Sequence, residues 1–110
     1  MRRFIALDLA LALVHALREP LAVLRRKNRH LADQLMRAST STPLNLSEGS
    51  ARRGADRLHL YRIAAGSAAE TRTCLQVAIA SGDVRATDDA VARALDLADQ
   101  VVRITAALTR

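Results

Sequence analysis

The 110-residue sequence has almost no aromatic side chains, few chain-breaking residues and a single cysteine. Phe4 and Tyr61 are the only aromatic residues, which nearly excludes recognition of single-stranded nucleic acid by stacking. Cys74 has no partner for an intramolecular disulfide, so we expect a buried, inert thiol in a reducing compartment. With two prolines, four glycines and a hydrophobic half composed mainly of Leu, Ala, Val and Ile, the composition predicts an all-α protein.

Catalytic and metal-binding patterns are also missing from the sequence. Di-iron carboxylate sites in helical bundles need two Glu-x-x-His pairs, and the nearest pattern is a single Asp56-x-x-His59. One cysteine is too few for the usual structural zinc sites. Neither a glycine-rich phosphate loop nor a serine in a strand–turn–helix elbow is present. We therefore expect no enzymatic activity, no metal and no cofactor.

Positive charge is abundant and is concentrated in one part of the chain. The net charge is +6 and the pI is near 11.2, which indicates a negatively charged partner. Residues 18–62 contain ten basic and four acidic side chains, and this difference equals the net charge of the whole chain. Such a cluster fits a solvated helix face as well as a surface that binds the phosphates of structured RNA or DNA. The residues that would contact phosphates are Arg25, Arg26, Lys27, Arg29, Arg37, Arg52, Arg53, Arg57 and Arg62.

The first residues imitate a secretory signal, because Arg2 and Arg3 precede an apolar run from Phe4 to Val14. Asp8 interrupts that run, and a charge at this point disfavours translocation. No apolar stretch approaches the ~20 residues that are needed to span a bilayer. We therefore expect a cytoplasmic protein without membrane association.

The hydrophobic pattern predicts a first helix over residues 3–18 that has two apolar stripes. One stripe contains Phe4, Leu7, Leu11, Val14 and Leu17, and the other contains Ile5, Leu9, Ala12 and Ala16. A helix with two apolar stripes must bury more than one face, which in so small a chain predicts a partner subunit. Pro20 should end this helix, and a basic connector over residues 25–30 should lead to a second helix that begins at Leu31.

Several residues between positions 43 and 56 predict interruptions of helical structure. Pro43 should kink or break the second helix, because proline removes a helical hydrogen bond. Gly49 and Gly54 should bracket a loop. The third helix is then expected to begin with Asp56 as its N-cap and to end near Ser81.

The third helix contains a run of small residues over positions 64–69, with Gly66 among them. Glycine in a helix interior costs up to ~1 kcal/mol relative to alanine, so we expect another helix to pack closely there. A fourth helix should follow a cap at Thr87, with a core stripe that includes Val91, Leu95 and Ala98. Four helices with short connections predict a single domain over residues 1–110, an antiparallel up-down-up-down four-helix bundle.

Two blocks of the sequence resemble a known family. The first reads Leu31-Ala32-Asp33-Gln34-Leu35-x-Arg37-Ala38-x-x-Ser41-x-Pro43-x-Asn45-x-x-Glu48-Gly49, followed by Arg52-Arg53, and the second reads Tyr61-Arg62-Ile63-Ala64-x-Gly66-Ser67-x-x-Glu70. Both are similar to the bacterial four helix bundle protein family, first noticed as products of open reading frames in intervening sequences of 23S ribosomal RNA genes. Thr42 and Ser47 depart from its pattern, which usually has a branched aliphatic residue and alanine at these positions.

The resemblance implies an antiparallel four-helix bundle without an established activity, and relatives that form barrel-like homopentamers. It also links the chain to the accessory variability proteins of diversity-generating retroelements, basic pentamers that bind a reverse transcriptase and nucleic acid. The family signature residues, interpreted as structural, are Gln34, Arg37, Asn45, Glu48, Gly49, Gly66, Ser67 and Glu70. Two functions stay open: a homo-oligomer that binds structured RNA or DNA, and a protein-interaction module, for example for a reverse transcriptase, whose cations only increase solubility.

Overall fold

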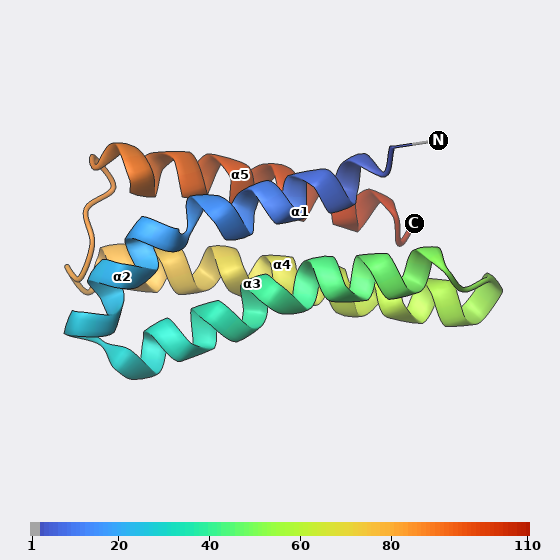
Figure 1. Cartoon of the computed structure of the whole chain (residues 1–110), viewed down its shortest axis with the longest axis horizontal. Helices are drawn as coiled ribbons and strands as arrows, with labels where there is room; N and C mark the ends of the chain where they lie inside the picture. The colour runs from blue at the N-terminus through green and yellow to red at the C-terminus, as the bar shows by residue number, and fades with distance from the viewer. Residues whose placement is uncertain (1–2) are drawn as a thin grey trace.

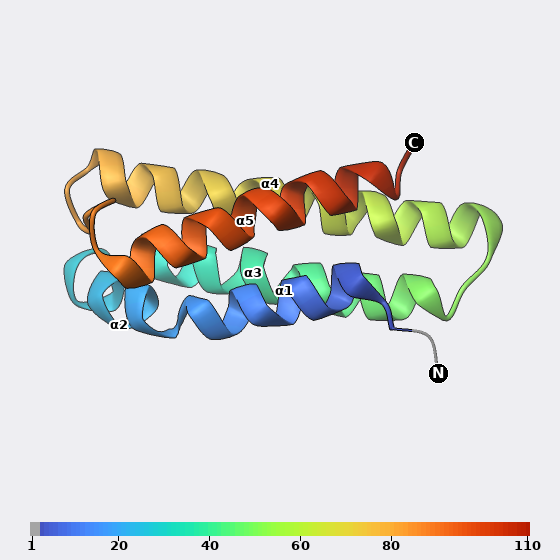
Figure 2. The ribbon, with the colours of Figure 1, turned by 90° about the horizontal axis from the view of Figure 1, so that it is seen from above.

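The computed structural model describes residues 3–110 and contains five α-helices over that range (Figure 1). They are α1 (Ile5–Ala16), α2 (Arg18–Lys27), α3 (Arg29–Ser50), α4 (Gly54–Ala80) and α5 (Asp89–Ala107). The helices form two layers, with α1 and α5 packed over α3 and α4 (Figures 1 and 2). The predicted all-α bundle is confirmed, with five helices instead of four among the described residues. Met1 and Arg2, the start of the signal-like segment, lie outside the described residues.

The predicted first helix divides at Leu17 and continues as α2, so the prediction that Pro20 ends it is wrong. Pro20 is the third residue of α2, where a backbone N–H has no intrahelical acceptor, and the proline ring therefore removes no helical hydrogen bond. The chain stays helical across the division, and the N–H of Leu21 donates to the carbonyl of Leu17 at 2.8 Å. Residues 25–27, predicted to lie in a connector, form the last turn of α2.

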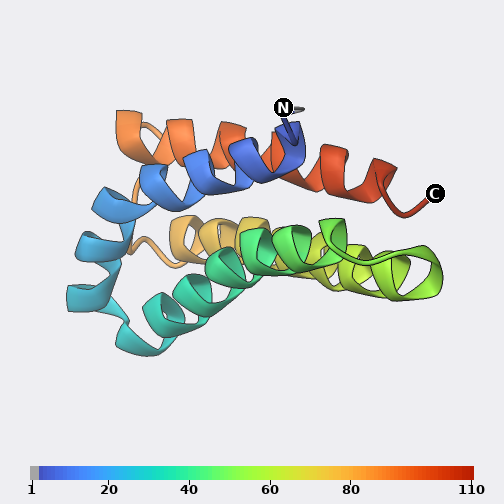
Figure 3. The same cartoon turned by 45° about the vertical axis from the view of Figure 1, so that its right-hand side comes forward.

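α3 continues through Pro43 and past Gly49, so neither residue ends the helix. Pro43 leaves the carbonyl of Ser39 without its helical donor, and the first half of α3 is inclined to its second half (Figure 3). Gly49 is buried against α4, where a Cβ would lie 2.8 Å from two ring carbons of Tyr61. The glycine is therefore needed for the contact between two helices, and the turn that follows comprises only residues 51–53.

The two predicted N-caps are wrong by one to three residues. Arg53 is the N-cap of α4 and Asp88 is the N-cap of α5, and neither side chain makes a capping hydrogen bond. Asp56 instead lies in the first turn of α4, and Thr87 precedes the cap of α5. A carboxylate in a first turn is still favourable, because it faces the positive end of the helix dipole.

Of the residues in the two predicted stripes, only Leu17 is fully buried, and the buried side of α1 lies elsewhere. Its buried residues are Ala6, Ala10 and Leu13, followed by Leu17. This line lies between the two stripes, so each stripe flanks the core instead of facing it. Ile5 and Leu11, one from each stripe, are 59% and 52% exposed. The bundle therefore leaves apolar surface on α1 that its own core does not cover.

α5 follows its predicted face more closely, with Val91 and Ala98 in the core. The close packing predicted at Gly66 is wrong within the subunit, because Gly66 is exposed and a Cβ there would meet nothing within 4 Å. Phe4 packs against Tyr61 with ring centroids 6.0 Å apart. Among residues 3–110, no helix is long and apolar enough to cross a membrane.

Candidate nucleic-acid interface

Four cations gather where α2 ends and α3 begins, and we call them the α2–α3 corner: Arg25, Arg26, Lys27 and Arg29. All four are exposed, and within the described chain none lies within 4.0 Å of a carboxylate oxygen. The helix dipole favours the three cations in the last turn of α2, because the C-terminal end of a helix is its negative end. The corner is thus a compact, solvated patch of positive charge.

Asn28 holds the two helix ends of the corner together. Its backbone N–H donates to the carbonyl of Leu24 at 2.7 Å, which continues α2 by one residue. Its side-chain Oδ1 accepts a hydrogen bond from the N–H of Leu31 at 3.1 Å, which caps α3. A single residue therefore closes one helix and opens the next, and the chain has little freedom to separate the four cations.

The second group of candidate cations lies in the turn between α3 and α4 and in the first part of α4: Arg52, Arg53, Arg57 and Arg62. α3 separates the two groups, and its 22 residues span about 33 Å at 1.5 Å per residue. The groups accordingly lie at opposite ends of the bundle (Figure 1). The basic stretch is continuous in sequence and forms two separate patches in space.

Two cations of the second group are engaged with the protein itself. Arg52 pairs with Glu48 at 3.2 Å, one turn earlier on the chain. Arg57 donates from Nε to the carbonyl of Gly49 at 3.2 Å and from Nη2 to the carbonyl of Ser50 at 3.1 Å. These carbonyls belong to the last turn of α3, so Arg57 acts as a side-chain cap for that helix. Arg53 and Arg62 are exposed and have no ion pair within residues 3–110.

A polar contact joins the middles of α3 and α4 and involves two of the family signature residues. Ser41 Oγ and Ser67 Oγ lie 2.8 Å apart. Asn45 Nδ2 donates to the carbonyl of Ser41 at 2.8 Å and to Ser41 Oγ at 3.1 Å. Together with the Glu48–Arg52 pair and the buried Gly49, these contacts fit the structural interpretation of Asn45 and Ser67.

The other signature residues lie on the surface of the subunit: Gln34, Arg37, Gly66 and Glu70. Arg37 and Glu70 form no ion pair within the described part of the chain. Arg37 is also far from both ends of α3, so it belongs to neither cationic group. Contacts within one subunit therefore do not explain these four residues.

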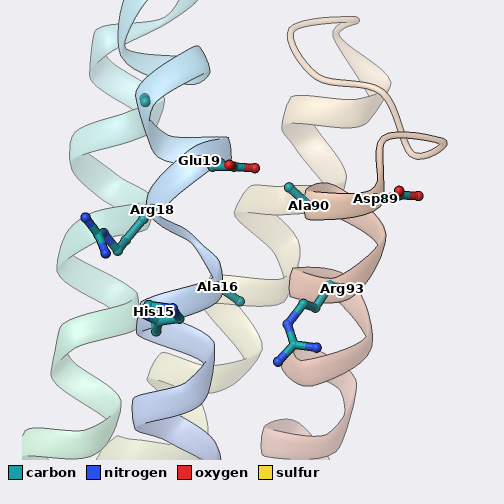
Figure 4. A pocket seen from close by; sticks show the side chains of 8 residues that line it. His15, Ala16, Arg18, Glu19, Asp89, Ala90 and Arg93 are labelled. Carbon is teal, nitrogen blue, oxygen red and sulfur yellow. The ribbon is translucent and has the colours of Figure 1, made fainter.

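A surface cleft of about 600 Å³ lies between the junction of α1 and α2 and the start of α5 (Figure 4). Its charged lining residues are His15, Arg18, Glu19, Asp89 and Arg93. Arg18 extends away from α5 and Glu19 extends toward it, and charges of both signs line the opening (Figure 4). The lining contains neither serine nor cysteine, and His15 therefore has no nucleophile to activate there.

Arg18 is a cation that the sequence reasoning left out of the candidate site. It lines a small cleft of about 200 Å³ together with Arg25, next to Leu21 and Met36. Arg18 and Arg25 are seven residues apart, which places them on the same side of α2. That spacing is the sequence signal that could have identified Arg18.

Within residues 3–110, no three His, Cys, Asp or Glu side chains are grouped closely enough to hold a metal ion. His59 and Asp56 are both exposed in the first turns of α4. Cys74 is buried, as its isolation in the sequence predicts. Burial, and to a smaller extent the negative charge of Glu70, raises the pKa of the Cys74 thiol above its ordinary value. The thiol is therefore protonated, and hence a poor nucleophile, at neutral pH.

The fold and the exposed cations define a small, all-helical bundle protein with a basic surface. The chain belongs to the 23S rRNA-intervening sequence protein family, whose sequence profile matches residues 3–107, and the predicted family is thereby confirmed. Its fold is similar to the crystal structure of a protein with unknown function from the S23 ribosomal protein family of Bacteroides thetaiotaomicron VPI-5482. That similarity has a TM-score of 0.82 and 18% sequence identity, and covers 96% of this chain and 98% of the other. A search of curated proteins finds no match.

Proposed function

We propose that this protein is a non-enzymatic, homo-oligomeric bundle that binds structured RNA or DNA through its basic surface. The observation that carries the proposal is the α2–α3 corner, where four exposed cations lie within five residues and none is paired with an acid from residues 3–110. Phosphates are the natural counterions for such a patch, because each contact releases condensed cations from the nucleic acid. Arg53 and Arg62 at the opposite end would add weaker contacts.

The aromatic residues support binding through charge and shape. Tyr61 is buried, and Phe4 is half-buried against it, so neither ring is free to stack on a base. Single-stranded nucleic acid is usually held on exposed aromatic platforms. The ligand expected here is therefore one whose backbone has a defined shape, and affinity should depend strongly on salt.

The test is a fluorescence-anisotropy titration with a structured RNA hairpin and a DNA hairpin at two salt concentrations. With four phosphate contacts, the affinity should fall about a hundredfold between 50 and 200 mM salt. The double variant Arg25→Glu/Arg26→Glu should lose most of the binding, and the matched variant Arg52→Glu/Arg53→Glu should lose much less. A flat salt response, or full binding by the first variant, would contradict the proposal.

The oligomer is supported by the apolar residues that the bundle leaves uncovered on α1. Ile5 and Leu11 are exposed although both are large and aliphatic, and a second subunit is a reasonable cover for them. The number of five subunits comes only from the resemblance to the family. Sedimentation velocity should give a species several times the 11.9 kDa subunit mass, and Leu11→Glu should reduce it. A stable monomer at micromolar concentration would contradict this part of the proposal.

The alternative is a protein-interaction module, for example an accessory of a reverse transcriptase. The observation that favours it is an apolar pair on the outer side of α3 and α4: Leu44, which is 68% exposed, and Ile63. Leu44 follows Ser41 by one turn and Ile63 precedes Ser67 by one turn, so both lie beside the serine contact. A partner captured by the wild type and lost with Leu44→Asp, in a chain that binds no nucleic acid, would favour this alternative.

A further inference from the structure

This inference rests on the proposed function, and it names the ligand of the α2–α3 corner. We infer that the corner inserts into the major groove of B-form duplex DNA and contacts the phosphates of both strands at once. The observation behind it is the direction in which the cations leave the end of α2. The ligand is identified by comparing the width of an α-helix with the width of the major groove in DNA and in RNA.

The last turn of α2 points its three cations to different sides. The buried residues of α2 are Pro20, Leu21 and Leu24, and they define its inner face. Successive residues of an α-helix are about 100° apart, since 3.6 residues complete a turn. Arg26 therefore lies opposite the inner face, while Arg25 and Lys27 lie on the two flanks. All three are exposed, so the end of α2 carries positive charge over most of its outer circumference.

A single extended strand passes along one flank of such an end and leaves the other flank unused. Two phosphate backbones that face each other across a groove reach both flanks, and Arg26 then points toward the floor of the groove. The corner lies at one end of the molecule, where α2 forms the edge of the bundle in Figure 3. An end with cations on both flanks thus matches a two-walled polyanion better than a single-stranded one.

The width of α2, the part of the corner that inserts, selects the type of duplex. An α-helix with its side chains is about 10–12 Å across, and the major groove of B-form DNA, at about 12 Å, admits it. The major groove of A-form RNA is deep and too narrow for the same insertion. B-form DNA is accordingly the duplex that lets Arg25 and Lys27 reach opposite backbones.

The start of α3 adds a fourth contact to the same end. Arg29 is the first residue of α3, and only Asn28 separates it from Lys27. Because the side chain of Asn28 is used to cap α3, the position of Arg29 relative to α2 is defined. Arg29 would therefore contact the phosphate backbone beside the inserted turn, outside the groove.

The experiment compares three probes of one sequence at several salt concentrations: a 20-bp DNA duplex, a 20-bp RNA duplex and a 20-nucleotide DNA strand. The full chain should bind the DNA duplex at least about tenfold more tightly than either of the others, because one flank is unused on a single strand and insertion fails on RNA. An RNA duplex or single strand that binds as tightly as the DNA duplex would overturn the inference.

The neutral variant Arg25→Gln/Lys27→Gln tests whether both flanks are in contact. For each corner bound, the salt slope of binding should decrease by about 1.8 on duplex DNA, which is two contacts at 0.9 each. On the single strand it should decrease by about 0.7, which is one contact. Equal decreases on the two probes would overturn the inference. Circular dichroism of the variant checks that the helices are intact.

Groove choice is tested by competition on the DNA duplex. A ligand that occupies the major groove should displace the protein, and a ligand that occupies the minor groove should not; the opposite result overturns the inference. Failure of the proposed function has a different signature: none of the three probes binds. Binding that persists after Arg25→Glu/Arg26→Glu and disappears after Arg52→Glu/Arg53→Glu would overturn the inference and leave nucleic-acid binding in place at the other end.

Discussion

Gly49 of α3 lies directly against the ring of Tyr61 of α4, and a Cβ at Gly49 would approach the ring carbons Cδ1 and Cε1 to 2.8 Å. Tyr61 cannot move freely away, because Phe4 packs on it from α1's side with ring centroids 6.0 Å apart. Even the smallest side chain at position 49 therefore overpacks the contact between α3 and α4.

We expect Gly49→Ala to lower the free energy of unfolding by about 1–3 kcal/mol, the usual cost of overpacking a core. The gain in helix propensity from alanine, up to ~1 kcal/mol, offsets part of the strain and is included in that range. Urea unfolding followed by circular dichroism at a fixed protein concentration measures the change. An unchanged or increased stability would show that the two helices can separate at this point without cost.

Gly66 offers the matched control, because it is in the same pair of helices and a Cβ added to it would meet no atom within 4 Å. Gly66→Ala should raise the free energy of unfolding by up to ~1 kcal/mol through helix propensity alone. The same unfolding experiment measures it. A decrease would mean that another subunit packs against Gly66 in the assembled protein.

The two glycines also show what the sequence could not predict. Both occur in helices, where glycine is unfavourable, so each position is expected to have a structural reason for lacking a side chain. The sequence does not show which neighbouring residue packs against the glycine. The neighbour depends on how α3 and α4 are aligned, which is a tertiary property. Close packing of α3 on the run of small residues is found at Ser67 and does not extend to Gly66, whereas Gly49 directly contacts Tyr61.

The helices themselves were predictable where one face is clearly apolar. α5 has one clearly apolar face, so Val91 and Ala98 were assigned to the core correctly. α1 is apolar on most sides, and periodicity alone could not select the line through Ala10 and Leu13. Pro20 was misleading because a proline removes a helical hydrogen bond only beyond the first turn, and the distance of Pro20 from the helix start was unknown.

The sequence predicts the excess of basic residues in the candidate site, but it does not predict how these residues are arranged on the surface. The excess of cations over residues 18–62 is visible in the sequence. Its division into two patches could have been anticipated, since a predicted helix separates Arg29 from Arg52 and helices are rigid rods. The hydrogen bonds of Arg57 to the carbonyls of α3 could not have been predicted, because they depend on the conformation of the turn over residues 51–53.

Arg57 is expected to contribute to stability through its two hydrogen bonds to the end of α3. Arg57→Met keeps much of the apolar stem and removes the donors, and should lower the free energy of unfolding by about 0.5–1.5 kcal/mol. Arg62→Met, at an exposed position on the same helix without an ion pair among the described residues, should change it by less than about 0.5 kcal/mol. Equal effects of the two variants in urea unfolding would argue against a capping role for Arg57.

Cys74 should make the stability of the protein depend on alkaline pH. Its ordinary pKa is 9.0, and burial, with the nearby charge of Glu70, raises the pKa in the folded state. Between those two values the unfolded chain releases the thiol proton while the folded protein keeps it, so raising the pH favours unfolding. Below pH 9.0 the contribution is fully present, and it is lost as the pH rises through the folded-state value.

The measurement is the free energy of unfolding of wild type and Cys74→Ala from pH 7 to pH 10.5. The two proteins differ only at position 74, so the difference between them isolates the thiol. Above pH 9.0 the wild type should lose stability relative to the variant by up to about 1.4 kcal/mol per pH unit. A difference that stays constant across this range would mean that the thiol ionises as readily in the folded protein as in the unfolded chain, and that Cys74 is reached by solvent.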